Sequence, residues 1–238
     1  MSFFSHRLLN KSKRTLATGG NFSYYEYKYL VRHENLSQVY DLLNEFYGSS
    51  DPYPSGVVDS IYYDTYDEQC LGQCLNGDSD KVKFRIRGYG DGTYISQHQK
   101  IKTLSGVAKY KCRLRKITAP GERAPYWEEL EPVDRNEYAS GAIAYATSRM
   151  GYLFPSIRVK YQRHRFRSYD DRMTLDTNIE VFAPQNGLSR TIAHAQLGQH
   201  VLEIKTRNVR PNLPFIGLIQ LQQVSFSKFM LGLELLNG

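Results

Sequence analysis

The stretch KVKFRIRGYGDGTYISQHQKIK, residues 81–102, decides the expected fold. In its first half, lysine or arginine occupies every second position from Lys81 to Arg87, with apolar residues between them. A period of two places the cations on one face of a β-strand and the apolar residues on the other. The sequence GDG at 90–92 is a turn signal, so the whole stretch predicts an antiparallel hairpin with one cationic face.

The same alternation recurs at Lys109–Arg115, at Arg163–Arg167 and at His98–Lys102. From Lys81 to Lys116 the chain has eleven lysines and arginines and one acid, a local charge of +10, whereas the whole chain carries +7. The remainder therefore carries −3. Like charges on neighbouring strands repel one another, so a sheet face built from them needs water or an anion to compensate. The pattern indicates a local site for a polyanion.

Length and composition are those of one folded domain. The chain has 238 residues, of which 41% are hydrophobic and 13% aromatic, and this excludes a disordered chain. Residues 1–20 contain no long apolar run and end in Gly-Gly, so we expect a flexible N-terminal lead-in that is neither a signal peptide nor a membrane span. Residues 21–238 are expected to form a single domain. Three cysteines favour a reducing compartment over a disulfide scaffold, and we expect a cytoplasmic protein.

Many alternating segments and few helical ones predict an α+β fold: an antiparallel β-barrel with flanking helices and a C-terminal helix. The hydrophobic patterns predict helices at 34–47, at about 67–75, at 136–150 and through most of 212–236. Strands are expected at 21–31, 57–66, 81–89, 93–102, 106–117, 200–208, and as a pair within 157–182 about the Asp170-Asp171 turn.

Seven short motifs occur in order along the chain, and they are Tyr24–Tyr29, Ser60–Thr65, Lys83–Tyr89, Tyr161–Arg163, Arg172–Asp176, Leu202–Lys205 and Ser225–Phe229. Together they resemble the motifs of the VTC-domain polyphosphate polymerases, a family that belongs with the CYTH proteins to the triphosphate tunnel metalloenzymes. The resemblance covers roughly residues 22–232. It implies a barrel whose tunnel binds a triphosphate through lysine and arginine and a divalent metal through glutamate.

The resemblance also implies roles for individual residues. Glu203 is the expected metal ligand for Mn²⁺ or Mg²⁺, with Glu26 as the second candidate. Tyr161 is expected beside the nucleotide phosphates, and Lys102 is an alternative to Lys100 because both share one strand face. The residues expected to carry catalysis are Arg85, Arg87, Arg163 and Lys228, and those expected to bind substrate are Lys28, Lys100, Lys111, Tyr161, Arg172 and Lys205.

General chemistry agrees with these roles. A condensed phosphate carries several adjacent negative charges and needs cations converging from different strands, with arginine giving bidentate contacts. A Mg²⁺ or Mn²⁺ ion that bridges phosphate oxygens needs only one or two carboxylates. Phosphoryl transfer depends mainly on positioning and charge stabilisation, so a general base is not obligatory. The sequence has no Walker loop, kinase signature or histidine-based metal motif that would offer another phosphate mechanism.

Two positions depart from the family pattern. Tyr24 stands where the tunnel enzymes often have the first glutamate of Glu-x-Glu-x-Lys, and His98 stands where an acid commonly precedes the lysine at Lys100. Fewer carboxylates make a two-metal hydrolase less favourable. The leading hypothesis is a polyphosphate polymerase-like phosphotransferase that moves the γ-phosphate of ATP onto phosphate or polyphosphate.

Three alternatives remain open on the sequence. The first is a tripolyphosphatase or nucleoside triphosphatase on the same fold, and the second is a non-catalytic polyphosphate- or nucleotide-binding module. Nucleic-acid binding is the weakest, because a closed tunnel excludes a duplex, and no nucleic-acid partner is expected. The expected partners are ATP or another triphosphate and polyphosphate, and any membrane association would need a separate membrane partner.

Overall fold

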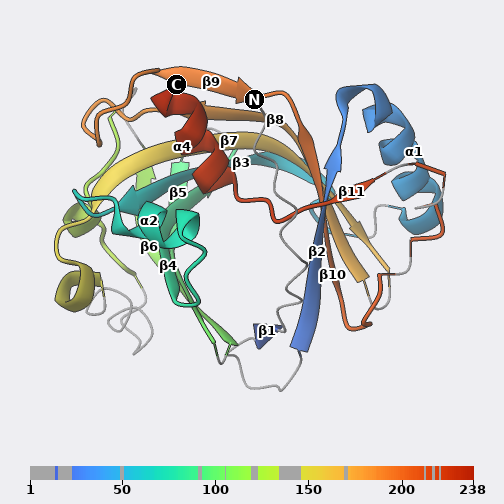
Figure 1. The fold of residues 1–238 in the computed structure, drawn as a ribbon, viewed down its shortest axis with the longest axis horizontal. Helices are drawn as coiled ribbons and strands as arrows, with labels where there is room; N and C mark the ends of the chain where they lie inside the picture. The colour runs from blue at the N-terminus through green and yellow to red at the C-terminus, as the bar shows by residue number, and fades with distance from the viewer. Residues whose placement is uncertain are drawn as a thin grey trace.

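A computed structural model of the chain describes residues 14–15, 23–48, 51–90, 93–104, 106–118, 123–133, 146–168, 171–211, 213–215, 218–219 and 221–238 (Figure 1). The strands are β1 (Arg14–Thr15), β2 (Ser23–Val31), β3 (Ser55–Asp64), β4 (Lys81–Tyr89), β5 (Thr93–Thr103), β6 (Gly106–Thr118), β7 (Phe154–Arg167), β8 (Asp171–Phe182), β9 (His194–Leu197), β10 (His200–Thr206) and β11 (Gln222–Gln223). The helices are α1 (Leu36–Tyr47), α2 (Gln69–Leu75) and α4 (Lys228–Asn237), with short turns of helix at His33–Asn35, Trp127–Glu129 and Ala146–Met150.

All the strands belong to one antiparallel sheet. Its order is β1-β2-β10-β8-β7-β3-β4-β5-β6, with β9 paired to β8 and β11 to β2. The hydrogen-bonded path begins at β1 and ends at β6, so within the described residues the sheet is open, although these two edge strands come near one another. The expected α+β class with an antiparallel sheet is confirmed, whereas the expected closure of the barrel is wrong for the described part of the chain.

The sheet curls around the segment that begins α4. Lys28 on β2 donates to the carbonyl oxygen of Phe226 at 2.8 Å, and Lys83 on β4 donates to the hydroxyl of Ser227 at 2.9 Å. Five strand spacings separate β2 from β4, which would put them about 24 Å apart in a flat sheet. Both lysines reach neighbouring residues, so the two halves of the sheet bend towards each other. We call the concave side the inner face (Figure 1).

Apolar side chains from two clusters cover the opposite side, which we call the outer face, while α4 and its partners lie on the inner side. Helix α1 packs Val39 and Leu43 against outer side chains of β2, β10, β8 and β7, and it lies beyond β2 and β10 in Figure 1. Trp127 packs near β3 and β4, where Tyr63 and Phe84 both make edge contacts with the indole. Because period-two strands bury these apolar residues outside, the charged residues between them are left on the inner face.

Helix α4 closes one end of the inner face. Phe229 lies 5.3 Å from the ring of Tyr62, and Gly232 approaches so closely that an added Cβ would meet Ile157 Cδ1 at 2.6 Å and Val181 Cγ1 at 2.8 Å. A side chain at Gly232 would therefore push the helix off the sheet. The apolar end of the inner face is covered in this way, and the charged part beside it is left uncovered by the helix.

The structure confirms some of the helices and strands expected from the sequence and contradicts others. The helix at 34–47 and the strand pair within 157–182 are confirmed, and β9 was not expected. The expected helix over most of 212–236 is wrong, since helix begins only at Lys228 and Gln222–Gln223 pair with β2. Pro214 and Gly217 explain the loss of helix, because proline and glycine both disfavour a helix interior. The expected helix at 136–150 lies outside the described residues up to 145, as does the lead-in apart from Arg14–Thr15.

Asp64 anchors α2 to the end of β3, and its removal should destabilise the protein. The carboxylate is fully buried and accepts from the backbone N–H groups of Thr65, Cys70 and Leu71 at 2.8, 2.8 and 2.9 Å. We expect Asp64→Ala to lower the free energy of unfolding by about 2–4 kcal/mol, because it leaves buried donors unpaired. Urea denaturation checks this, with Asp67→Ala, an exposed neighbour, as the control. Equal losses in the two variants would contradict the anchoring role.

Candidate functional site

Charged and hydroxyl side chains from eight strands share the inner face. Cross-strand register establishes this: Arg85 lies opposite Tyr62 on β3 and His98 on β5, and His98 lies opposite Lys111 on β6. On the other half of the sheet, Glu203 lies opposite Lys28 and Thr174. The inner face so defined includes Glu26, Lys28, Tyr62, Arg85, Arg87, His98, Lys100, Lys111, Tyr161, Arg163, Asp176, Glu203 and Lys205.

The half formed by β4, β5 and β6 presents lysine, arginine and one histidine on the inner face, and we call it the cationic wall. Arg85, His98 and Lys111 form one row across the three strands, and Lys83, Lys100 and Lys109 form the next. These three strands contain no aspartate or glutamate in their sequence. Like charges held side by side are unfavourable without a counter-charge, so the wall is suited to bind an anion.

Arg85 and Arg87 are held by hydroxyl groups. Arg85 donates to the phenol of Tyr62 at 3.2 Å, and Arg87 donates to Tyr161 at 3.3 Å and to Ser60 at 3.0 Å. Among the described residues, neither guanidinium forms an ion pair with a carboxylate. The neutral partners fix the orientation of both guanidinium groups and leave their positive charge available to a ligand.

The positive charge of Arg85 and Arg87 changes the pKa of the neighbouring phenol of Tyr62. Burial alone would raise its pKa, but the charges of Arg85 and Arg87, together with the hydrogen bond from Arg85, lower the pKa of Tyr62 to about 7. A phenol ordinarily titrates near 10. The direction of the shift shows that the surroundings of Arg85 and Arg87 stabilise negative charge.

On the opposite half of the sheet the inner-face carboxylates of Asp176, Glu203 and Glu26 are paired with lysine or arginine. Asp176 is fully buried and accepts two bonds from Arg163, at 2.7 and 2.8 Å, and one from Lys228 at 2.7 Å. Burial raises the pKa of Asp176, but the charges of Lys228 and Arg163 outweigh it and leave the pKa below the ordinary value. One negative charge faces two positive ones, so this group holds Lys228 and Arg163 in place and keeps a net positive charge.

Glu203 and Glu26 lie on neighbouring strands and converge on one amine. Lys28 Nζ is 4.0 Å from Glu203 and 3.7 Å from Glu26, and Lys205 Nζ is 2.5 Å from Glu203. Burial would raise the pKa of Glu203, but Lys205, Lys28 and Arg163 lower it well below the ordinary value, so the carboxylate is ionised.

These two carboxylates fit a divalent metal only together with phosphate oxygens. Within the described ranges, no three histidine, cysteine, aspartate or glutamate side chains group closely enough to hold a metal ion by themselves. Mg²⁺ typically takes one or two carboxylates and completes its ligands with substrate phosphates and water. An ionised Glu203 with Glu26 beside it meets that requirement.

The remaining residues expected from the sequence lie at the ends of the same face. Lys100 stands between Lys83 and Lys109, and Lys102 lies one row further along on the same face, opposite Lys81. Lys111 and Arg172 are exposed, with Arg172 opposite Lys205 at the end of β8. The structure thus brings all twelve expected site residues to one face, while their individual roles stay predictions.

Asp176, Tyr62 and Lys83 lie on the inner face and were not expected as site residues. Asp176 contacts two of the expected cations, Tyr62 contacts a third, and Lys83 bonds to Ser227 beside α4. Period-two spacing carries the signal for Lys83, which precedes Arg85 by two residues, and for Tyr62, which follows Ser60 by two. No pattern in the sequence shows that the segment around Ser227 reaches β4.

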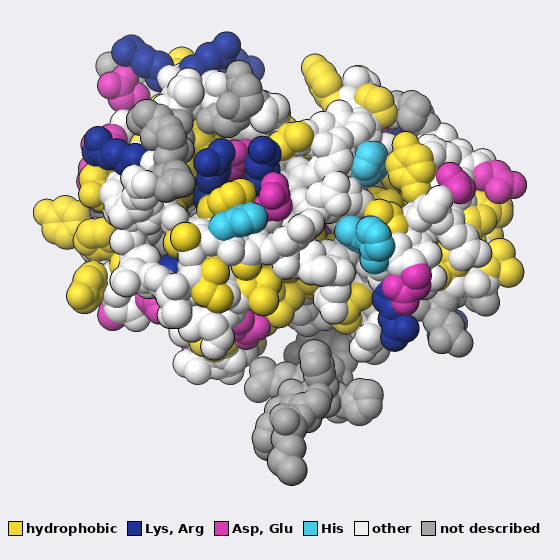
Figure 2. Space-filling model, turned by 90° about the horizontal axis from the view of Figure 1, so that it is seen from above, with side chains coloured by type: hydrophobic (Ala, Val, Ile, Leu, Met, Phe, Trp, Pro, Cys, Tyr) yellow, Lys and Arg dark blue, Asp and Glu magenta, His cyan; other side chains and the backbone are white. Residues whose placement is uncertain are grey.

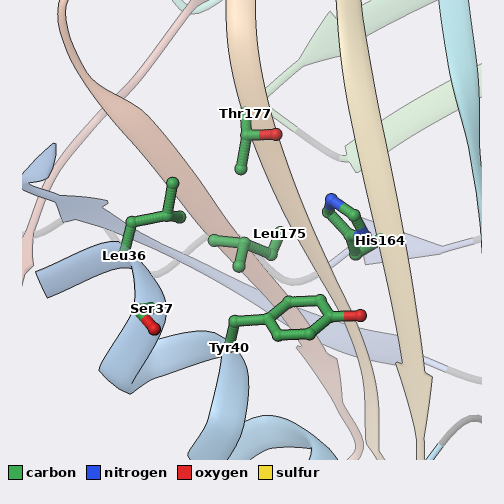
Figure 3. Close-up of a pocket in the computed structure, with 6 residues that line it drawn as sticks. All are labelled: Leu36, Ser37, Tyr40, His164, Leu175 and Thr177. Atoms are coloured by element: carbon green, nitrogen blue, oxygen red, sulfur yellow. The ribbon is translucent and has the colours of Figure 1, made fainter.

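A separate pocket lies on the outer face (Figure 3). Its volume is about 310 Å³, and it opens between α1 and strands β7 and β8. His164 follows the inner-face residue Arg163, and Leu175 precedes the inner-face residue Asp176. Because successive side chains of a strand alternate between faces, His164 and Leu175 point to the outer face. The lining residues, drawn in Figure 3, are Leu36, Ser37, Tyr40, His164, Leu175 and Thr177.

The surface seen from above differs in charge from the cationic wall. On this face lysine and arginine form small groups with acidic side chains nearby, and no continuous basic patch spans it (Figure 2). In the part of the chain that the structure describes, no helix combines the length and the apolar character needed to cross a membrane.

Comparison with known proteins agrees with the geometry. The sequence model of the VTC domain matches residues 23–237. No curated protein matches the chain. A proposed adenylate cyclase from Bacillus halodurans has a similar structure, with 13% identity and a TM-score of 0.52 over 85% of this chain and 92% of that chain, which shows a shared fold. A proposed adenylyl cyclase from Hippeastrum, described as having a dominant triphosphatase activity, gives a TM-score of 0.48 at 13% identity, over 87% of this chain and 93% of that one. The match to residues 23–237 covers nearly the whole chain, which therefore belongs to the VTC domain family.

Proposed function

We propose that this protein is a polyphosphate polymerase-like phosphotransferase, which moves the γ-phosphate of ATP onto phosphate or polyphosphate. The observation that carries the proposal is the cationic wall facing a half-sheet whose inner-face carboxylates, Asp176, Glu203 and Glu26, are paired with lysine or arginine. A triphosphate has the length and charge to span several rows of cations, whereas a single phosphate does not. We also propose that the protein works in the reducing cytoplasm, because Cys70, Cys74 and Cys112 are free thiols.

The residues of the inner face divide the work of transfer. Arg85 and Arg87, oriented by Tyr62, Tyr161 and Ser60, bind the phosphate whose charge increases in the transition state. Arg163 and Lys228, fixed by the shared Asp176, stabilise the same charge from the opposite half of the sheet.

The remaining cations hold the rest of the substrate. Lys28, Lys100, Lys111, Arg172 and Lys205 bind the other phosphates or the growing chain, with Tyr161 beside the nucleotide phosphates. Bound Mn²⁺ or Mg²⁺, held by Glu203 with Glu26 and phosphate oxygens, would supply further charge neutralisation. In-line transfer between bound phosphates needs alignment of acceptor and donor more than it needs a base.

The paired carboxylates favour transfer over hydrolysis. A hydrolase has to activate water, but Glu203 is bonded to Lys205 and Asp176 to Arg163 and Lys228, so both are stabilised as ions and are weak bases. A phosphate acceptor enters as an anion and needs no such activation. We therefore place the phosphatase activity second.

Incubation of the purified protein with ATP and Mn²⁺ tests the proposal. We expect inorganic polyphosphate to accumulate as chains that grow with time, with ADP as the second product. Release of orthophosphate alone would replace the polymerase by a triphosphatase. Tight binding of tripolyphosphate with no turnover would leave a binding module, and the enzyme proposal would then be wrong.

Glu203→Gln tests the metal role separately. The change keeps the shape of the side chain and removes its charge, so we expect the Mn²⁺ concentration for half-maximal activity to rise at least tenfold, roughly the loss known for weaker perturbations of metal sites. Glu180→Gln is the matched control, since Glu180 pairs with His194 and lies outside the inner-face set. An unchanged Mn²⁺ requirement in Glu203→Gln would rule out Glu203 as the ligand.

A further inference from the structure

One residue of the cationic wall is not a permanent cation. His98 lies at the centre of β5, opposite Arg85 on β4 and Lys111 on β6, and its Nε2 is 2.9 Å from the hydroxyl of Ser96. Ser96 is itself buried and lies opposite Arg87. The imidazole is therefore fixed on the inner face between positive groups on both sides.

Its surroundings keep the free imidazole neutral. Burial and the charges of Arg85, Arg87 and Lys111 lower the pKa of His98 to about 2, against an ordinary value near 6.5. The groups that act on it come from both neighbouring strands, β4 and β6, and Lys100 shares its own strand. No acid in the sequence of β4, β5 or β6 offsets these charges.

A condensed phosphate on the wall would reverse this balance. One negative charge about 4 Å away raises the pKa of an imidazole by roughly 3 at an effective dielectric constant near 20. Two such charges exceed the lowering of the His98 pKa that burial and the neighbouring cations cause together. A chain of phosphates brings several charges within reach of one row, whereas orthophosphate brings fewer and spans no second row.

We propose that His98 takes up a proton when a condensed phosphate chain binds to the cationic wall, and that the imidazolium then contacts the chain. This inference rests on the proposed function and specifies its substrate class as a condensed polyanion. The proton comes from solvent and stays on the ring until the ligand leaves, so free His98 and bound His98 differ by one proton. The site consequently gains a cation only when a polyanion occupies it, which favours chains over orthophosphate.

The test compares the wild type with His98→Gln. The affinity of each protein for tripolyphosphate is measured by calorimetry from about pH 8 to about pH 6. If the complex binds one more proton than the free protein, the affinity for tripolyphosphate rises by up to tenfold each time the pH falls by one unit. Protonation of tripolyphosphate itself affects both proteins equally, so the difference between their slopes reports His98. We expect the wild type to gain at least fivefold more affinity than His98→Gln over this range. Equal slopes would overturn the proposal.

Nuclear magnetic resonance of the imidazole in the wild-type protein is a second test, and it does not depend on whether the His98→Gln variant folds. The ring resonances of His98 should stay in the neutral position without ligand and move to the protonated position with tripolyphosphate at about pH 6. A ring that stays neutral in the complex would contradict proton uptake. If tripolyphosphate fails to bind to either protein, the proposed function and this inference fall together. Proton-linked binding without chain growth would leave His98 in its role and remove the polymerase.

Discussion

Replacement of Arg85 by alanine should lower kcat/KM for ATP-dependent chain growth by about 100- to 1,000-fold, the loss typical of removing one preorganised donor at a developing charge. Arg85 is oriented by the phenol of Tyr62 and, within the described residues, has no carboxylate partner, so its charge is directed at the ligand. Arg87→Ala should behave in the same way, because Ser60 and Tyr161 hold that guanidinium equally firmly. Steady-state kinetics with ATP and Mn²⁺ measure both losses.

Arg123→Ala is the matched control for this series. It removes one positive charge from an exposed site where the partner is Glu129, away from the inner face, and it should leave kcat/KM within twofold. Arg85→Ala should also let the pKa of Tyr62 rise from about 7, which the ultraviolet absorbance of the phenolate follows. Full activity in Arg85→Ala, or a loss equal to that in Arg123→Ala, would show that the wall does not act in catalysis.

Removal of the carboxylate of Asp176 should produce the largest loss of stability. Lys228 and Arg163 both bond to this fully buried group, so Asp176→Ala leaves two cations without their acid inside the sheet. Breaking a buried ion pair from one side costs about 3–5 kcal/mol. We expect a decrease of this size in the free energy of unfolding, and activity should fall as well because Arg163 and Lys228 lose their orientation.

Urea denaturation with a two-state fit measures the effect of Asp176→Ala. Glu34→Ala serves as the control, because its pair with Arg32 is exposed at 3.8 Å and such surface pairs contribute about 1 kcal/mol or less. A loss for Asp176→Ala no larger than that for Glu34→Ala would contradict the structural role of the buried group. Tripolyphosphate should recover part of the lost stability if the two cations still bind it.

The sequence predicts well where the strands lie and which face of each strand is charged or apolar. Alternation from Lys81 to Arg87 required no knowledge of distant residues, because a pleated strand turns successive side chains to opposite sides. The structure places those cations together with Lys100 and Lys111 as the period implies. The local pattern was sufficient to predict the face of each cation, since the apolar residues that alternate with the cations all pack on one side of the strand.

Long-range features could not be read from the same patterns. Between β7 and β8 the register shifts at Lys160/Gln162, and Asn178 adopts a φ of +48°, so a β-bulge changes which residues of β8 face inward. Leucines between 212 and 221 suggest a helix, but the chain there contains Pro214 and Gly217 and then pairs with β2. These outcomes depend on tertiary contacts that override local propensity.

The site was predictable as a set of cations and less so as a set of pairings. Asp176 lies within a motif that the sequence identifies, yet its bond to Lys228 joins a strand to a helix 52 residues away. Likewise the hydroxyl groups of Tyr62 and Tyr161 bind Arg85 and Arg87 only once β3, β4 and β7 lie side by side in the sheet. Sequence spacing names the charged residues, but the fold decides which of them are neutralised.

The most direct test of the central claim is a crystal structure with a non-hydrolysable ATP analogue and Mn²⁺. We expect phosphate density along the inner face, against Arg85, Arg87 and Lys228, and an anomalous peak for Mn²⁺ beside Glu203. Phosphate bound on the outer face, or a triphosphate that makes no contact with Arg85 and Arg87, would contradict it.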